Sequence, residues 1–157
     1  MISGAIFSTD RRHRYILWRI WDEETKPLMV IGLNPSTADE IKNDPTVTRC
    51  IKRAYNLGFG GLYMANLYGY RSTDPKGLKH TDDPVGLYND STILSYASES
   101  GMIIAAWGTH GSSRGPMLAN YLKNNGIQLH ALRILKHNIP AHPLYLPYDL
   151  KPIEYWR

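Results

Sequence analysis

Short apolar runs alternate with amphipathic segments along most of this chain. The apolar runs predict strands at residues 15–21, 28–33, 61–70, 101–108 and 127–135, the first of them paired with residues 5–8. Segments with a helical repeat predict helices at residues 44–58, 85–98 and 114–126. Strands that alternate with helices favour an α/β fold, a three-layer sandwich whose central sheet is mostly parallel and covered on both faces.

The chain has the length of one domain. Its 157 residues contain no linker, no internal repeat and no low-complexity segment. We therefore expect a single α/β domain over residues 1–157, with an N-terminal hairpin at residues 1–26 and the core at residues 27–157.

The segment at residues 43–60 carries the clearest helix signals. Asp44 is in the position of an N-cap, Pro45 takes the first helical position and Gly58 ends the helix. The apolar stripe consists of Val47, Cys50, Ile51 and Ala54, which leaves Arg49, Lys52 and Arg53 near the solvent side.

Composition limits the class of protein. Hydrophobic residues make up 43% and charged residues 20%, which is typical of a globular protein. No apolar run approaches a membrane span and the N-terminus lacks the order of a signal peptide, so we expect a cytoplasmic protein with no membrane partner. Cys50 is the single cysteine, and its apolar setting indicates packing rather than reactivity. The net charge of +4 suits a polyanionic partner.

Polar sequences follow several of the predicted strands. They read GLNPST from residue 32, ANLYGYRST from residue 65, AAWGTHG from residue 105 and AHPLYLP from residue 141. Parallel sheets bind ligands beyond the carboxyl ends of their strands, so these segments can converge on one crevice. Taken alone, residues 34–37 are equally well explained as a turn.

Six ordered motifs carry a resemblance to a known family. They are GLNPSTADE, NDPTVTRC, NLYGYRSTDPKGL, DPVGLYND, AAWGTHG and AHPLYL, within residues 29–146. Together they resemble the family called domain of unknown function 1643, which is found in bacteria and their phages. This resemblance implies a family without a settled activity.

The same order of motifs resembles, more distantly, the uracil-DNA glycosylase superfamily. That resemblance implies a uracil-DNA glycosylase-like fold and hydrolysis of the N-glycosidic bond of a pyrimidine or modified pyrimidine in DNA. It makes Asn34 and His142 the candidate catalytic residues. The residues that it implies for substrate binding are Gly32, Leu33, Pro35, Ser36, Asn66, Arg71, Trp107 and Leu146.

Each implied role has a physical basis in the residue type. Asn34 can orient a water through its carbonyl oxygen, and Asn66 can read the edge of an extruded base. His142 can donate to a developing oxyanion, and Leu146 can act as an apolar wedge between base steps. Arg71 can contact a phosphate. These residues also have structural alternatives. Asn66 can be a strand-end amide and His142 a loop histidine. Leu146 can be a core leucine, and Arg71 can lie in a solvated basic loop.

Three departures from the superfamily pattern lower the expected rate. Asn34 stands where the most active members have Asp, Ser36 replaces a glycine or an aromatic residue, and Leu144 and Tyr145 replace serines. An amide cannot accept a full proton, so the enzyme is expected to be slow unless another carboxylate compensates. Asp39, Asp44 and Asp74 are the candidates for that carboxylate.

No cofactor is expected. The six histidines are scattered, without the spacing of a metal site, and no nucleotide-loop motif occurs. The Gly-rich segment before residue 115 can hold at most one phosphate, with Arg114 nearby. Two alternatives to a DNA glycosylase stay open: an enzyme of free nucleotides or nucleosides, and a non-catalytic module that binds nucleic acid or a partner protein. The DNA can be duplex or single-stranded, and the sequence leaves the oligomeric state open.

Overall fold

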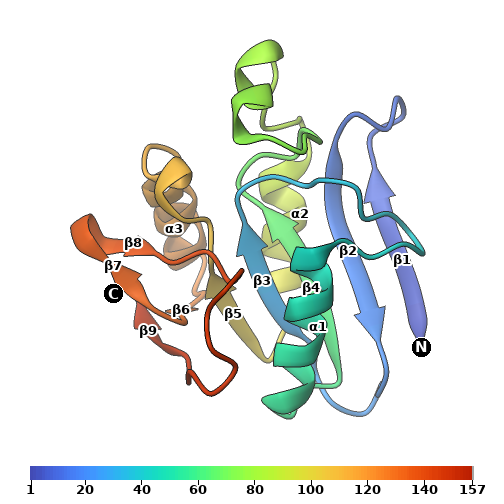
Figure 1. The fold of residues 1–157 in the computed structure, drawn as a ribbon, viewed down its shortest axis with the longest axis vertical. Helices are drawn as coiled ribbons and strands as arrows, with labels where there is room; N and C mark the ends of the chain where they lie inside the picture. The colour runs from blue at the N-terminus through green and yellow to red at the C-terminus, as the bar shows by residue number, and fades with distance from the viewer. Residues whose placement is uncertain (157) are drawn as a thin grey trace.

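A sheet of seven strands forms the centre of the computed structural model, which describes residues 1–156 (Figure 1). In chain order the strands are β1 (Ile2–Phe7), β2 (Arg14–Ile20), β3 (Leu28–Gly32), β4 (Gly61–Asn66), β5 (Met102–Ala105), β6 (Leu129–Ala131) and β9 (Ile153–Tyr155). Across the sheet their order is β1-β2-β4-β3-β5-β6-β9. Two short strands, β7 (Ile134–Leu135) and β8 (Ile139–Pro140), pair with each other in a separate hairpin.

The sheet is mixed. Strands β4, β3, β5 and β6 pair parallel, whereas β1 pairs antiparallel with β2, β2 with β4, and β9 with β6. The prediction of a mostly parallel sheet is therefore right for the four central strands only. The predicted N-terminal hairpin is confirmed as the antiparallel pair β1 and β2, whose short connection allows a hairpin but no crossover. The antiparallel pairings of β2 with β4 and of β9 with β6 were not predicted.

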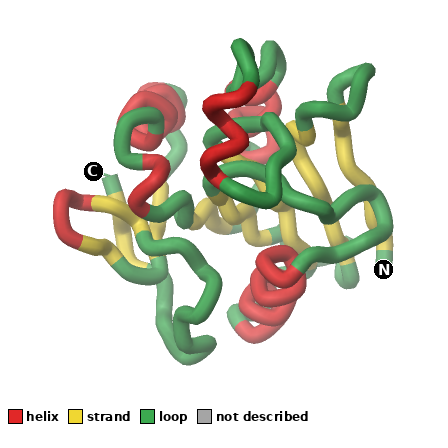
Figure 2. The backbone as a smooth tube through the Cα atoms, turned by 45° about the horizontal axis from the view of Figure 1, so that its top comes forward, coloured by secondary structure: helices red, strands yellow, loops and turns green. Residues whose placement is uncertain are grey.

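Helices cover both faces of the sheet. The buried side chains of α1 (Pro45–Asn56) pack with those of Val30 and Met64 on one face, while α2 (Asn89–Ala97) and α3 (Gly115–Asn124) pack with Ile31 and Ala65 on the other. Figure 2 shows these helices on opposite sides of the strands. Three short 3-10 helices, η1 (Pro75–His80), η2 (Thr109–Gly111) and η3 (Lys136–Asn138), lie in the connections.

Helix α1 begins as its sequence predicts. The Asp44 side chain accepts a hydrogen bond from the Val47 N–H at 2.9 Å, and Pro45 takes the first helical position. Cys50 is fully buried, and this burial raises the pKa of its thiol to about 12, as a packing role requires. The prediction that Arg53 lies near solvent is wrong. Its side chain is buried and donates to the carbonyl oxygens of Leu146 and Pro147.

Two boundaries and one strand differ from the predictions. Helix α2 begins at Asn89 rather than residue 85, because Gly86 takes a positive φ of 92° and donates to the Asp83 carboxylate. Strand β6 ends at Ala131, and the chain turns into the β7–β8 hairpin. Strand β9 lies beyond a proline-rich segment and was not predicted at all.

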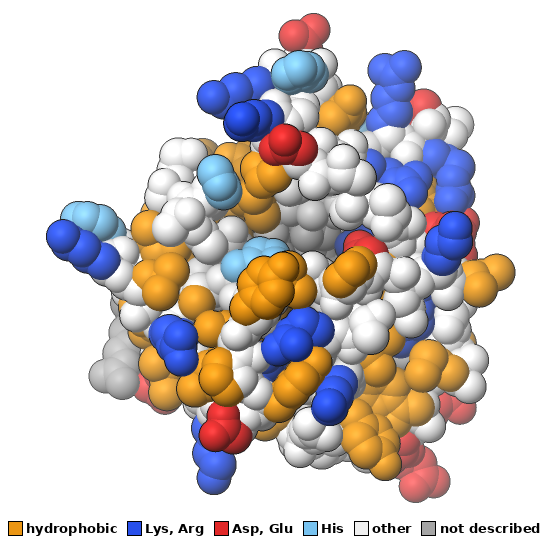
Figure 3. Space-filling view, in the orientation of Figure 1, with side chains coloured by type: hydrophobic (Ala, Val, Ile, Leu, Met, Phe, Trp, Pro, Cys, Tyr) orange, Lys and Arg blue, Asp and Glu red, His pale blue; other side chains and the backbone are white. Residues whose placement is uncertain are grey.

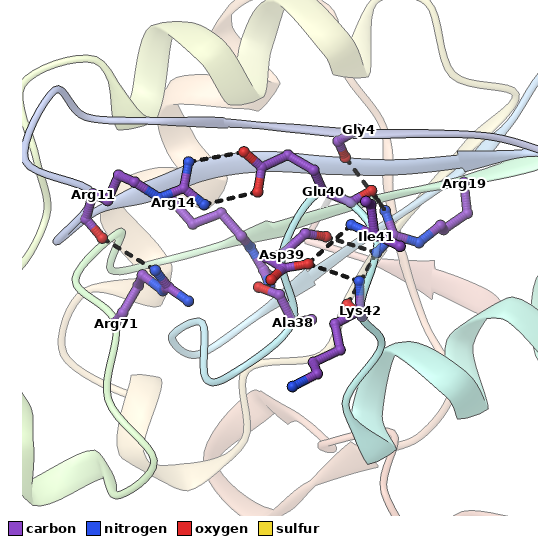
Figure 4. A network of polar contacts seen from close by, with 10 residues as sticks. All are labelled: Gly4, Arg11, Arg14, Arg19, Ala38, Asp39, Glu40, Ile41, Lys42 and Arg71. Atoms are coloured by element: carbon purple, nitrogen blue, oxygen red, sulfur yellow. Dashed lines mark hydrogen bonds and ion pairs between the residues drawn. The ribbon is translucent and has the colours of Figure 1, made fainter.

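Arginine side chains of β2 hold the long connection between β3 and α1. The buried Arg19 guanidinium donates to the backbone carbonyls of Asp39, Glu40 and Lys42, and its Nε donates to the Asn43 side chain at 2.9 Å. Figure 4 shows the bonds from Arg19 to these carbonyls, with the paired hydrogen bonds from Arg11 to the Glu40 carboxylate beside them. The connection has no regular structure, so these bonds fix its path.

Replacing Arg19 should therefore loosen the connection. Arg19→Met keeps most of the apolar stem but leaves several carbonyls without their charged donor, which we expect to cost on the order of 3 kcal/mol of unfolding free energy. Urea denaturation measures the loss. Arg12→Met is the matched control, because the Arg12 side chain is 75% exposed with only a 4.0 Å contact to Asp10. Equal losses in the two variants would contradict the anchoring role.

Candidate functional site

A cavity of about 440 Å³ opens where β3, β4 and β5 end. The chain passes from β3 to β4 on one side and later to β5 on the other, so the cavity lies at the switch point of the parallel strands. Figure 3 shows the hollow near the centre of this face. Its lining consists of Leu33, Asn34, Ser36, Asp44, Pro45, Thr46, Ser72, Thr73, Pro75, Trp107, Gly108, Thr109, His110, His142 and Leu144.

A smaller cavity of about 40 Å³ continues from the larger one toward the sheet. Both cavities are lined by Leu33, Asn34, Ser36, Asp44, Thr46 and His142. The smaller one adds strand residues and the residues next to them: Arg14, Gly32, Pro35, Val47, Met64 and Asn66. Most of the residues expected at the site are thus brought together in one crevice.

The Asn34 side chain is held by its nitrogen. Its Nδ2 donates to the Ser72 carbonyl at 2.8 Å and to the Pro35 carbonyl at 3.3 Å. Within residues 1–156 its Oδ1 accepts no hydrogen bond, and the residue lines both cavities. Asn34 therefore offers an acceptor oxygen to a ligand or a water, with its amide group already fixed in place.

The Asn66 side chain is held the other way round. The Arg14 guanidinium donates to Asn66 Oδ1 at 3.2 Å, which assigns the amide orientation and leaves Nδ2 as a donor toward the smaller cavity. Gly32, on the neighbouring strand, lies against this nitrogen, since a Cβ there would be 3.0 Å from it. Asn66 thus presents a donor, whereas Asn34 presents an acceptor.

Arg14 brings a positive charge beneath the site. Its side chain is buried, and burial lowers the pKa of Arg14 to about 10, an effect that Asp44 opposes. The guanidinium stays protonated at neutral pH and donates also to the Ala38 carbonyl at 3.2 Å. A buried cation held by an amide and a carbonyl gives the cavity a positive floor.

Of the three aspartates expected as a compensating carboxylate, Asp44 lines the cavities, whereas Asp39 and Asp74 do not. Its Oδ1 caps helix α1, while Oδ2 has no hydrogen-bond partner within the described chain and the residue lines both cavities. It is the single carboxylate among the residues that line them. The capping pattern already explained an aspartate at this position, so the sequence alone could not choose among the three.

His142 takes one defined tautomer. Its Nδ1 accepts a hydrogen bond from the Leu144 N–H at 3.2 Å, and burial lowers the pKa of the imidazole. The ring is therefore neutral at pH 7 and carries its hydrogen on Nε2, which makes Nε2 a donor. Gly108 lies beside His142 and takes a positive φ of 71°, a backbone conformation that favours glycine.

Two predicted residues, Arg71 and Leu146, do not line either cavity, and a third, Trp107, lines the larger one with a buried ring. Arg71 does not line the cavities, since its guanidinium donates to the Arg11 carbonyl and lies 4.8 Å from the Phe7 ring centroid. Leu146 is buried in the core with α1 rather than exposed as a wedge. Trp107 lines the larger cavity, but its ring is buried and a Cβ at Gly111 or Gly115 would overlap it, so the ring also positions the loop after β5.

The phosphate site considered beside Arg114 is occupied by protein. Arg114 forms an ion pair with Asp90 and donates to the Leu67 carbonyl at 3.0 Å, so it ties α3 to α2. Among residues 1–156 no group of histidines, cysteines and carboxylates could hold a metal ion. The helices of the same part of the chain include none that is long and apolar enough to cross a membrane.

These features define a single-domain α/β protein with a polar, positively floored cavity at the carboxyl ends of parallel strands. The chain belongs to the family described as protein of unknown function (DUF1643), whose model matches residues 14–144. No curated protein and no solved structure matches it. The family resemblance is thereby confirmed, whereas these comparisons give no evidence for the resemblance to uracil-DNA glycosylases.

The depressed pKa of His142 has a measurable effect on stability. Above about pH 6.5, the pKa of an exposed histidine, the ring is neutral in both the folded and the unfolded chain. It then adds no pH dependence to the free energy of unfolding. Below that pH the unfolded chain binds the proton first, so the free energy of unfolding should fall until the pH passes the folded pKa. Urea denaturation at about pH 7.5 and about pH 5.5 should show a smaller drop for His142→Gln than for the wild type. His80→Gln, at an exposed position, is the control, and an unchanged drop in His142→Gln would refute the assignment.

Proposed function

We propose that this protein hydrolyses the N-glycosidic bond of a pyrimidine or modified pyrimidine nucleotide in DNA, without a metal. One observation carries the proposal. A free carboxylate oxygen of Asp44, an open amide oxygen of Asn34 and the imidazole donor of His142 line the same cavity. Glycoside hydrolysis needs these groups, namely acceptors for an attacking water and a donor for the departing base.

Asp44 and Asn34 would act on the water. The Asn34 Oδ1 accepts one hydrogen from it, because the Asn34 nitrogen is already bound to Ser72. Asp44 Oδ2 accepts the proton that the water loses on attack, which an amide cannot do. The carboxylate that the sequence lacks at position 34 is in this way supplied from position 44.

His142 and Asn66 would act on the base. The departing pyrimidine carries its negative charge on N1 and on its carbonyl oxygens, and a neutral imidazole N–H stabilises that charge without giving up its proton. The Asn66 Nδ2 donor suits a second carbonyl of the same ring. Arg14, behind Asn66, holds the amide in this orientation and adds a favourable positive potential.

The site's size and charge support a nucleotide as substrate. A volume of about 440 Å³ lies within the range of small-ligand cavities. The chain carries a net charge of +4, which favours a polyanion over a free nucleoside. We extend the motif resemblance to the whole fold and propose a uracil-DNA glycosylase-like three-layer arrangement, which the order of the motifs supports.

The function is tested on oligonucleotides. Duplex and single-stranded substrates carrying uracil, thymine, hydroxymethyl pyrimidines and glycosylated pyrimidines are incubated with the protein and scored for abasic sites. Asp44→Asn and Asn34→Ala should each lower the rate on the active substrate by roughly 10²-fold or more, since each removes a group from the attacking water. Asp44→Asn keeps a side-chain oxygen that can cap α1, so its melting temperature should stay close to that of the wild type.

The matched control is Asp74→Asn. Asp74 caps η1 through a hydrogen bond from the Lys76 N–H at 2.9 Å but does not line either cavity. Its variant should keep full activity. Absence of abasic sites with every base in wild-type protein would reject the reaction, and equal rates for Asp44→Asn and the wild type would reject the role of the carboxylate.

Asn66 should set which base is accepted. In Asn66→Asp the carboxylate can pair with Arg14, so the fold is expected to persist, while the donor toward the cavity becomes an acceptor. Binding should then shift from a pyrimidine with a carbonyl at that edge to one with an amino group, by roughly ten-fold or more. Competition between uracil- and cytosine-containing oligonucleotides measures the shift. An unchanged preference in a folded variant would show that Asn66 only supports the strand end.

A further inference from the structure

Tyr145 is the most exposed large hydrophobic side chain in the described part of the chain, at 88%. It also takes a φ of 70°, in the left-handed region that costs a non-glycine residue energy. An exposed ring gives the folded protein no packing in return for that cost. A strained backbone at an exposed aromatic residue therefore points to a role outside the folding of the chain.

The structure holds this strained loop in place from both sides. Leu144, directly before Tyr145, lines the larger cavity. Directly after it, Leu146 is buried, and its carbonyl accepts hydrogen bonds from Arg49 at 2.6 Å and Arg53 at 3.1 Å. The backbone is thus held on both sides of Tyr145, by the Leu144 N–H to His142 Nδ1 and by the Leu146 carbonyl, and the exposed ring directly follows a residue that lines the cavity.

Positive charge gathers on the same loop, around the ring of Tyr148. The Tyr148 ring has Arg49 Cζ at 4.4 Å, Lys52 Nζ at 4.5 Å and Arg53 Cζ at 5.2 Å from its centroid. Within residues 1–156 none of these cations forms an ion pair with a carboxylate. Figure 3 shows Lys and Arg side chains among hydrophobic ones over α1 and the C-terminal loop, just below the hollow. An aromatic surface beside unneutralised cations suits a strand of nucleic acid.

We propose that Tyr145, with Arg49 and Lys52, forms a platform for the DNA strand that flanks the nucleotide in the cavity. The neighbouring base stacks on the Tyr145 ring, and the phosphate beyond it lies near Lys52, which is exposed. This proposal rests on the proposed function for its choice of polymer. It assigns to Tyr145 a surface role that differs from the chemistry inside the cavity, and it needs no cleavage to be observed.

The test compares a strand with a single nucleotide. Binding of a fluorescein-labelled 12-nucleotide single-stranded DNA containing uracil is measured by anisotropy, and binding of deoxyuridine monophosphate by calorimetry. Tyr145→Gly removes the ring and relieves the positive φ. It should bind the strand roughly ten-fold or more weakly and bind the mononucleotide as the wild type does, with a melting temperature at or above that of the wild type.

Three further variants sharpen the result. Tyr145→Phe should keep strand binding, because stacking needs the ring and not the hydroxyl. Lys52→Gln should lower the slope of log affinity against log salt by about 0.7, the value for one contact to a single strand. Tyr55→Ala is the control and should leave strand binding unchanged. Tyr55 lies on α1 with Lys52 and is 69% exposed, but it lies beside Trp21 and does not line the cavity.

Each outcome decides the proposal. It is overturned if the wild type does not bind the strand, if Tyr145→Gly binds it as tightly as the wild type, or if that variant loses the mononucleotide to the same extent. Abasic-site assays on the same proteins test the proposed hydrolysis separately from the platform. Strand binding that depends on Tyr145 but yields no abasic sites would support the platform and reject the hydrolysis. Abasic sites together with unchanged strand binding in Tyr145→Gly would support the hydrolysis and reject the platform.

Discussion

The hydrogen bonds from two buried guanidiniums of β2 to the connection between β3 and α1 determine most of the site. That connection carries Asn34 at one end and Asp44 at the other, yet it has no helix or strand of its own. Arg19 fixes its middle through several carbonyls, and Arg14 fixes the Ala38 carbonyl and the Asn66 amide together. The antiparallel strand β2 thus positions side chains that lie at the ends of the parallel strands β3 and β4 or in the connection after β3.

The same arrangement occurs on the other wall of the cavity. Arg49 and Arg53 of α1 hold the loop after His142 by its carbonyl oxygens, as Arg19 holds the first connection. In both places the buried cation is satisfied by neutral acceptors rather than by a carboxylate. Asp39 and Asp44 partly offset the charge of Arg14 and Arg19, whereas Arg49 and Arg53 form no ion pair within the described residues, so the wall after His142 contributes the stronger potential for anions.

The sequence predicted regular elements better than side-chain directions. Asp44 and Pro45 identified the start of α1, and the apolar runs identified β3 and β5, because caps and burial leave local signals. Arg14, Arg19 and Arg53 were missed as buried residues, since a charged side chain is normally assigned to solvent. For the loop after His142 the sequence also did not show which side chains are buried and which are exposed. Leu146 is buried and Tyr145 exposed there, and an irregular segment has no period from which to infer this.

The contact between Trp107 and the two glycines that face it leaves no spare volume behind this part of the cavity wall. A methyl group at Gly111 or Gly115 would overlap the Trp107 ring, so the loop after β5 or the start of α3 would have to shift. Elsewhere in the lining, Ser36, Thr46 and Thr73 are small and partly or fully exposed. Substitutions among these hydroxyl side chains can therefore change the volume of the cavity at little cost to the fold, whereas substitutions around the tryptophan cannot.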